Sequence, residues 1–123
     1  MWIFTKKGFV SAVQHEDDSR LMVVRARAER HLVSLFPDEH IIELAPADYP
    51  YRVRITRQEF VEWATAQAEA IDYTDFKSSL TDPKYKAVCS EIWSVAHDLQ
   101  GPEAHRYPGP DDDWKEDHLT SDD

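Results

Sequence analysis

Four arginines alternate along two short segments of the chain. Arg25 and Arg27 lie two residues apart in LMVVRAR, and Arg52 and Arg54 lie two apart in YRVRI. A spacing of two places both members of each pair on one face of a β-strand. Guanidinium groups hold phosphate or carboxylate through paired hydrogen bonds. The pattern predicts an anion-binding face if the strands share a sheet; the alternative is a solvated face whose arginines pair with acidic neighbours.

The segment DYPY at residues 48–51 is a second candidate. Asp48, Tyr49 and Tyr51 surround Pro50, which makes a rigid aromatic turn. Two interpretations stay open. The turn either recognises a partner or plugs the entry to the strand that follows.

A third candidate is the junction IDYTDFK at residues 71–77. Asp72, Tyr73 and Lys77 bring a carboxylate, a phenol and an amine into six residues, which is a set that can transfer protons. Helix junctions also collect such residues for turn formation, so the structural interpretation competes with the chemical one.

The chain lacks the sequence signatures of common catalytic sites. It has three glycines and no phosphate-binding glycine loop, nucleophile elbow, HExxH or paired CxxC motif. We expect no metal site and no cofactor, because none of the six histidines has metal-ligand spacing. Cys89 lies on an apolar helical stripe, where a small buried hydrophobe is a better interpretation than a catalytic thiol. These observations favour a non-enzymatic protein, although they do not exclude an enzyme.

The elements that position these candidates follow from hydrophobic periodicity and turn residues. The expected strands are residues 1–5, 9–14, 21–27, 40–44 and 51–55. A short helix is expected at 28–36. A second helix begins after Thr56, where Glu59 completes a capping box, and a third begins at Pro83 with Asp82 as its cap. The order β-β-β-α-β-β-α-α predicts an α+β fold, an antiparallel sheet of about five strands with helices packed on one face.

Charge divides the chain into a body and a tail. The net charge is −10, and residues 101–123 supply −6 of it from two basic and eight acidic residues. We expect a single domain at 1–100 and an acidic Pro/Asp-rich tail at 101–123. Trp114 follows the triplet Asp111–Asp113, so the tail either recognises a protein partner or lies on the arginine face as an internal anion.

Separated segments of the body resemble a group of small bacterial proteins whose function is not established. The resemblance rests on the start WIFT…GFVSAVQ, on LMVVRAR, on DYPYR and on IDYTDFK, and it covers roughly residues 2–100. Asp75 stands where the group often has asparagine. The resemblance implies no activity, but it directs attention to the arginine pairs, the DYPY turn and the 71–77 junction.

These observations favour a cytoplasmic, non-enzymatic binding or regulatory protein that acts through a protein partner. The alternative is a small enzyme or sensor that binds a phosphate- or carboxylate-bearing ligand on the arginine face. No apolar run is long enough to span a membrane, and the negative charge argues against direct nucleic-acid binding. An exposed edge strand would permit a homodimer.

Overall fold

The computed structural model describes residues 1–106. These divide into two compact units, Met1–Thr81 and the part that begins at Asp82. The division between the units falls before the last α-helix, and the single domain expected at 1–100 stays a prediction. Residues 107–123, which include Trp114 and Asp111–Asp113, lie outside the described residues.

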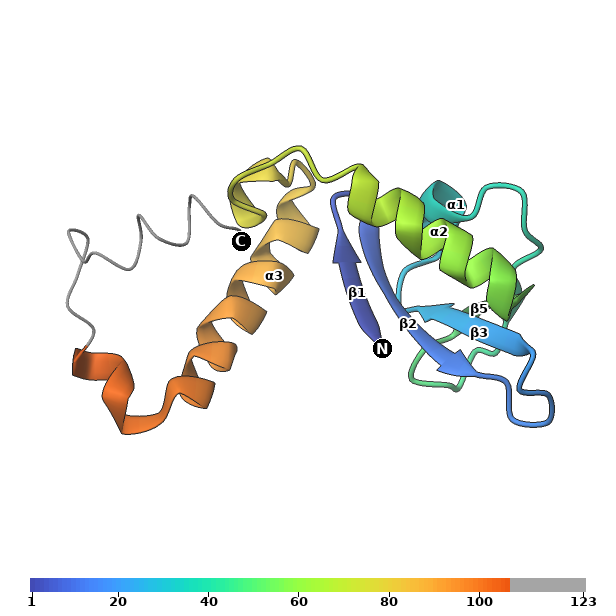
Figure 1. Ribbon diagram of the computed structural model, residues 1–123, viewed down its shortest axis with the longest axis horizontal. Helices are drawn as coiled ribbons and strands as arrows, with labels where there is room; N and C mark the ends of the chain where they lie inside the picture. Colours follow the sequence, from blue (N-terminus) through green and yellow to red (C-terminus); the bar gives the residue numbers. More distant parts are fainter. Residues whose placement is uncertain (107–123) are drawn as a thin grey trace. The chain divides into compact units, whose positions relative to one another are not determined.

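The first unit is built on a five-stranded antiparallel sheet, which confirms the expected α+β fold (Figure 1). Its strands follow the spatial order β1-β2-β3-β5-β4. Their bounds are β1 Trp2–Thr5, β2 Gly8–Gln14, β3 Leu21–Ala26, β4 Ile42–Glu43 and β5 Tyr51–Thr56. The fourth strand is shorter than the expected 40–44, and residues 45–50 follow it as a loop that carries two prolines.

A tight hairpin joins β1 to β2. Thr5 pairs with Gly8 across a two-residue turn, and Gly8 has a φ of +155°. Glycine has a second reason to stand here, because a Cβ at this position would overlap the ring of His31. His31 Nδ1 accepts a hydrogen bond from the Phe9 N–H at 3.2 Å. The hairpin and the first helix therefore fix one another.

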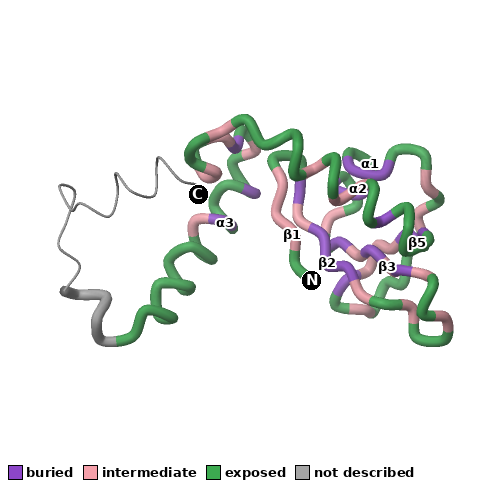
Figure 2. Tube along the Cα trace, in the orientation of Figure 1, coloured by how far each residue is buried: buried purple, intermediate pink, exposed green. Residues whose placement is uncertain are grey.

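Two helices cover one face of this sheet, which we call the core face. The helices are α1 Glu29–Leu35 and α2 Arg57–Glu69. Alternate strand residues meet them, as the period-two pattern predicts. Figure 2 shows these buried positions along β2, β3, β5 and α1. The buried cluster consists of Val10, Ala12, Met22, Val24, Ala26, Leu32, Leu35, Phe36, Val53, Ile55 and Phe60.

The start of α2 agrees with its sequence signals, but its apolar stripe does not bury along its whole length. Thr56 accepts from the Glu59 N–H at 3.0 Å, and Glu59 accepts from the Thr56 N–H at 2.8 Å, which completes the capping box. Trp63 stacks on Phe36 and donates its indole N–H to the Leu35 carbonyl. The second half of the stripe stays exposed, since Ile71 beyond the helix is 57% accessible.

The second unit begins with α3 Pro83–Ala96. Asp82 caps it by accepting from the N–H groups of Lys84 and Tyr85, as expected from the Asp-Pro start. A 3₁₀ segment, η2 His97–Arg106, follows, with Gly101 at a φ of +68°. Among residues 1–106, no helix has the length and apolar character needed to cross a bilayer.

Candidate functional site

The four arginines lie together on the sheet face opposite the core, which we call the open face. Arg25 of β3 is directly opposite Arg52 of β5, and Val23 is opposite Arg54. Side chains of directly opposed residues share a face, and residues two apart along a strand share it too. Arg27 continues the row just past the end of β3. The expected grouping of the two pairs is thus present.

Tyr49 lies among these arginines and organises two of them. The carbon at the centre of each guanidinium, in Arg25 and in Arg27, lies 4.6 Å from the centre of the Tyr49 ring. This is the geometry of a cation–π contact. Tyr49 is 5% exposed, and its ring meets Phe9 edge to face. The loop at residues 45–50 therefore folds back over the open face and closes part of it.

Arg25 is the most constrained member of the row. Its Nη2 donates to the Ser11 hydroxyl at 2.8 Å, and Ser11 is itself 1% exposed. Its Nε is enclosed and has no hydrogen-bond partner among the described residues. A buried donor without a partner costs stability, so this atom is a place where a bound acceptor would be favourable.

The other three arginines keep most of their donors toward solvent. Arg27 Nη1 donates to the Asp48 carbonyl at 2.8 Å, and Arg52 Nε donates to the Tyr49 carbonyl at 3.2 Å. Arg54 is exposed. Within residues 1–101, no ion pair joins any of the four arginines to a carboxylate. In this part of the chain the face is solvated, as the alternative interpretation expects, but its arginines lack the acidic partners that the same interpretation expects.

Residues of the DYPY turn separate onto different faces. The Asp48 carboxylate accepts the Tyr49 N–H at 2.9 Å and so shapes its own loop. Tyr49 has the buried position of a plug. Tyr51 is opposite Ala26, on the core face, and packs against the core cluster. The structure thus brings Asp48 and Tyr49 to the arginines but not Tyr51.

The 71–77 junction lies beside the hairpin turn and away from the arginine row. Lys6 Nζ and Asp72 Oδ1 form an ion pair at 2.9 Å, and this contact lowers the pKa of the Asp72 carboxyl. Tyr73 contacts the ring of Phe76. Lys77 begins a 3₁₀ turn, η1 Lys77–Ser79. None of these groups is recorded in contact with Arg25, Arg27, Arg52 or Arg54, so the 71–77 junction does not converge with the guanidiniums.

Three aromatic residues form the other half of the open face. Phe4 stacks on Phe9 with ring centres 4.2 Å apart, and Trp2 meets Phe9 edge to face at 5.8 Å. Sequence analysis assigned these residues to strands without assigning them a surface. The alternation of Trp2, Phe4 and Phe9 along the first hairpin was the signal that places them on one face.

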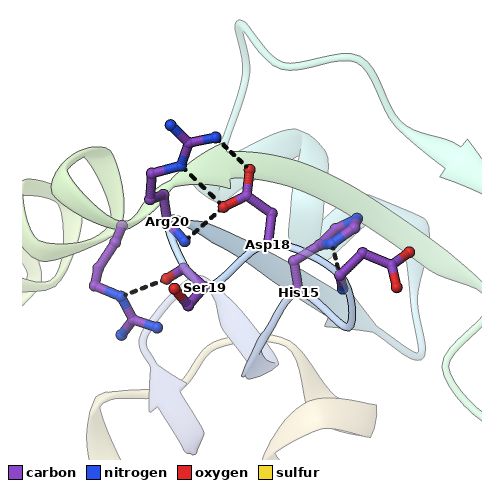
Figure 3. Close-up of polar contacts among 6 residues, drawn as sticks. His15, Asp18, Ser19 and Arg20 are labelled. Atoms are coloured by element: carbon purple, nitrogen blue, oxygen red, sulfur yellow. Dashed lines mark hydrogen bonds and ion pairs between the residues drawn. The ribbon is translucent and has the colours of Figure 1, made fainter.

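The turn between β2 and β3 contains an arginine that is already paired with a carboxylate (Figure 3). Arg20 binds both carboxylate oxygens of Asp18, each at 3.0 Å, and its backbone N–H donates to the same group. The hydrogen bonds from Arg20 lower the pKa of Asp18 from 3.8 to about 2. Nearby, the His15 ring accepts the Asp17 N–H at 3.1 Å.

Two hollows of the first unit lie elsewhere than the arginine row. One of about 220 Å³ is lined by Phe36, Pro37, Trp63 and their neighbours; the other, of about 630 Å³, lies between β1 and α2. No group of three or more potential metal-ligating side chains is found among the described residues. Burial raises the pKa of the Cys89 thiol, which keeps it protonated and unreactive at neutral pH.

The candidate site is thus a row of guanidiniums around Tyr49 on an exposed sheet face. Comparison with known proteins adds no further assignment, because no family model, no curated protein and no solved structure matches the chain.

Proposed function

We propose that this chain is a non-enzymatic binding protein that recognises a carboxylate-rich protein segment on the open face of its sheet. The observation that carries the proposal is the row of four arginines, none of which has a carboxylate partner among the residues that the structure describes. Arg25 and Arg52 are cross-strand neighbours of like charge, an arrangement that is unfavourable until an anion joins it. The first unit as a whole holds ten basic and thirteen acidic residues, so this row is a local positive surface on an acidic unit.

The length of the row favours a polypeptide over a single small anion. Arg54 lies opposite Val23, so the row extends over four residue steps from Val23 to Arg27, the last of them past the end of β3. At about 3.3 Å per residue this is about 13 Å, and carboxylates at alternate positions of an extended chain recur about every 7 Å. A segment with acidic residues at alternate positions therefore matches the row along its length.

The surroundings of the row support binding without catalysis. Asp72 and Tyr73 are engaged elsewhere, with Lys6 and Phe76, and His15 is in the turn after β2. The residues that we considered for proton transfer thus do not contact the arginines, which favours binding over acid–base catalysis at this row. We also propose that the protein is cytoplasmic and that it is related to the small bacterial proteins that its segments resemble.

One observation favours a second candidate, a sensor for a small phosphate- or carboxylate-bearing ligand. The enclosed Nε of Arg25 has no partner among the described residues, and it lies beside the Tyr49 ring. Because this atom is enclosed, an anionic oxygen reaches it only when the Tyr49 loop opens, and it would then bind at the centre of the row and not along it. The two candidates therefore depend on different arginines.

Calorimetric titration of the full-length protein separates them. The probes are a synthetic peptide with aspartate at alternate positions, the same peptide with asparagine, inorganic phosphate and citrate. We expect the aspartate peptide to bind and Arg54→Gln to weaken it about tenfold, because a charge-assisted hydrogen bond contributes about 1.5 kcal/mol. Lys86→Gln is the matched control, since it removes one exposed positive charge from α3.

Equal affinity for the aspartate and asparagine peptides contradicts the proposed function. Binding of phosphate or citrate that Arg54→Gln leaves unchanged would support the small-ligand candidate instead.

A further inference from the structure

The free edge of β1 presents backbone groups that no described residue bonds. β1 is the outer strand of the sheet, with β2 on its other side. Met1 and Ala12 exchange both of their backbone hydrogen bonds, each at 2.8 Å. Hydrogen-bonded pairs alternate along an antiparallel ladder, so Ile3 also bonds toward β2. The N–H and C=O groups of Trp2 and Phe4 therefore point outward, away from the sheet.

An apolar hollow of about 630 Å³ runs beside this edge, on the core-face side. β1 and the hairpin turn form one wall, and the second half of α2 with the residues that follow it forms the other. Ile3, Ala64, Ala68 and Ile71 are among the lining residues. This is where the predicted apolar stripe of α2 stays uncovered. An unpaired strand edge and an uncovered apolar surface thus lie next to one another.

We propose that a second copy of this chain covers the unpaired strand edge and the apolar hollow. Its own β1 pairs antiparallel with the β1 of the first copy. In a two-fold pair centred on Ile3, Trp2 lies opposite Phe4 of the second copy, and Phe4 lies opposite its Trp2. These are the residues whose backbone groups point outward, so both pairs exchange their N–H···O bonds. Ile3 then lies opposite Ile3 of the second copy, in the closer, non-hydrogen-bonded kind of pair.

The side chains match this pairing on each face of the sheet. On the open face, Trp2 and Phe4 form aromatic pairs across the two-fold axis, and Trp2 is 65% exposed without such a partner. On the core face, Ile3 of the second copy enters the hollow toward Ala68 and Ile71. The pairing therefore covers backbone, aromatic and aliphatic surface at once.

The residues at the end of β1 select this register and this partner. A shift of the centre from Ile3 to Phe4 would place Lys6 of one copy opposite Trp2 of the other, although Lys6 is already paired with Asp72 at 2.9 Å. In the register centred on Ile3, Lys6 and Lys7 lie beyond the paired residues. The opposite sheet edge, β4 Ile42–Glu43, is too short for an equivalent ladder. The β1 edge alone is self-complementary, as a two-fold interface requires.

This inference does not rest on the proposed function, because it uses no arginine. Sedimentation equilibrium of the full-length protein across the micromolar to millimolar range is the first test, and we expect twice the chain mass. Trp2→Val and Trp2→Pro are a matched pair, since both remove the indole but only proline removes the outward N–H. We expect the dissociation constant of the dimer to rise about tenfold with valine and at least a hundredfold with proline.

A second measurement uses the unaltered chain and so does not depend on how the variants fold. The amide of Phe4 should exchange slowly with solvent at high protein concentration and quickly on dilution, because only the second copy bonds it. A monomer throughout the concentration range overturns the proposal. So does a dimer that Trp2→Pro leaves unchanged, or one in which the Phe4 amide exchanges quickly at every concentration.

Discussion

The same strands form both faces of the sheet, but the side chains on the two faces have different partners. On the core face, Val24 and Val53 are paired across the ladder and sealed by α1 and α2, so that each is 1% exposed or less. On the open face, the next pair along the same ladder is Arg25 and Arg52. Arg25 contacts the Tyr49 ring and the Ser11 hydroxyl, and Arg52 donates to the Tyr49 carbonyl. No carboxylate in the described part of the chain pairs with either. The core face therefore supplies most of the buried apolar surface of the unit, and the open face leaves guanidinium groups available for the binding that we propose.

The largest contrast is expected from neighbouring residues that point to opposite faces. Val53→Asp places a charge in the core and should cost about 4 kcal/mol or more of unfolding free energy. Arg54→Asp, one residue along, should change it by about 0.5 kcal/mol at most. Urea denaturation of the two variants measures both. Similar losses in the two would mean that the open face is also part of the folded core.

Tyr49 is a residue of the open face that we expect to contribute to the stability of the unit. Tyr49→Ala should cost about 3 kcal/mol, because it removes a buried ring from Phe9, Arg25 and Arg27. Tyr49→Phe should be almost neutral, since the contacts of the ring remain. The same denaturation experiment checks both variants. A large loss with phenylalanine would show that the hydroxyl, and not the ring, holds the loop.

Gly8 tests the link between the hairpin and the core face. Gly8→Ala adds a Cβ against the His31 ring at a φ of +155°, and we expect a loss of about 2 kcal/mol. Gly101→Ala is the control, because Gly101 also has a positive φ but no atom within 4 Å of its Cβ position. Thermal melts should show a clearly larger shift for Gly8. Equal shifts in melting temperature for the two variants would mean that the backbone conformation, and not the His31 contact, causes the loss.

The smallest expected effect compares a paired arginine with the unpaired row. The folded-state pKa of Asp18 is about 2, below its ordinary value of 3.8, because Arg20 binds the ionised form. The ion pair therefore adds stability above about pH 4 and loses it as the pH falls toward 2. Asp18→Asn should flatten the stability profile in this window only. An unchanged profile would mean that the exposed pair adds nothing in solution.

Local patterns predicted the fold because they act within a few residues. Thr56 and Glu59 specify the start of α2, and the alternation in residues 51–55 specifies which side chains meet the helices. Four arginines on one face followed from the same alternation once the strands were neighbours. These predictions needed no knowledge of distant contacts.

What sequence analysis left open depends on chain folding over longer distances. The position of Tyr49 over Arg25 and Arg27 results from a loop with two prolines, for which no periodicity exists. The apolar side chains at the end of α2 stay exposed because the sheet ends at β1. The sequence of the helix does not encode where the sheet ends. The aromatic half of the open face was readable from the spacing of Trp2 and Phe4, but only after β1 and β2 were paired.

We propose that Arg27, Arg52 and Arg54 bind an external anion, whereas Arg20 is already paired with the Asp18 carboxylate. Titration of the full-length protein with the alternating-aspartate peptide, followed through the arginine Nε–Hε resonances in NMR spectra, tests this directly. We predict saturable shifts for Arg27, Arg52 and Arg54 and none for Arg20, which Asp18 already binds. Shifts that are equal across all arginines and that simple salt reproduces would contradict the account.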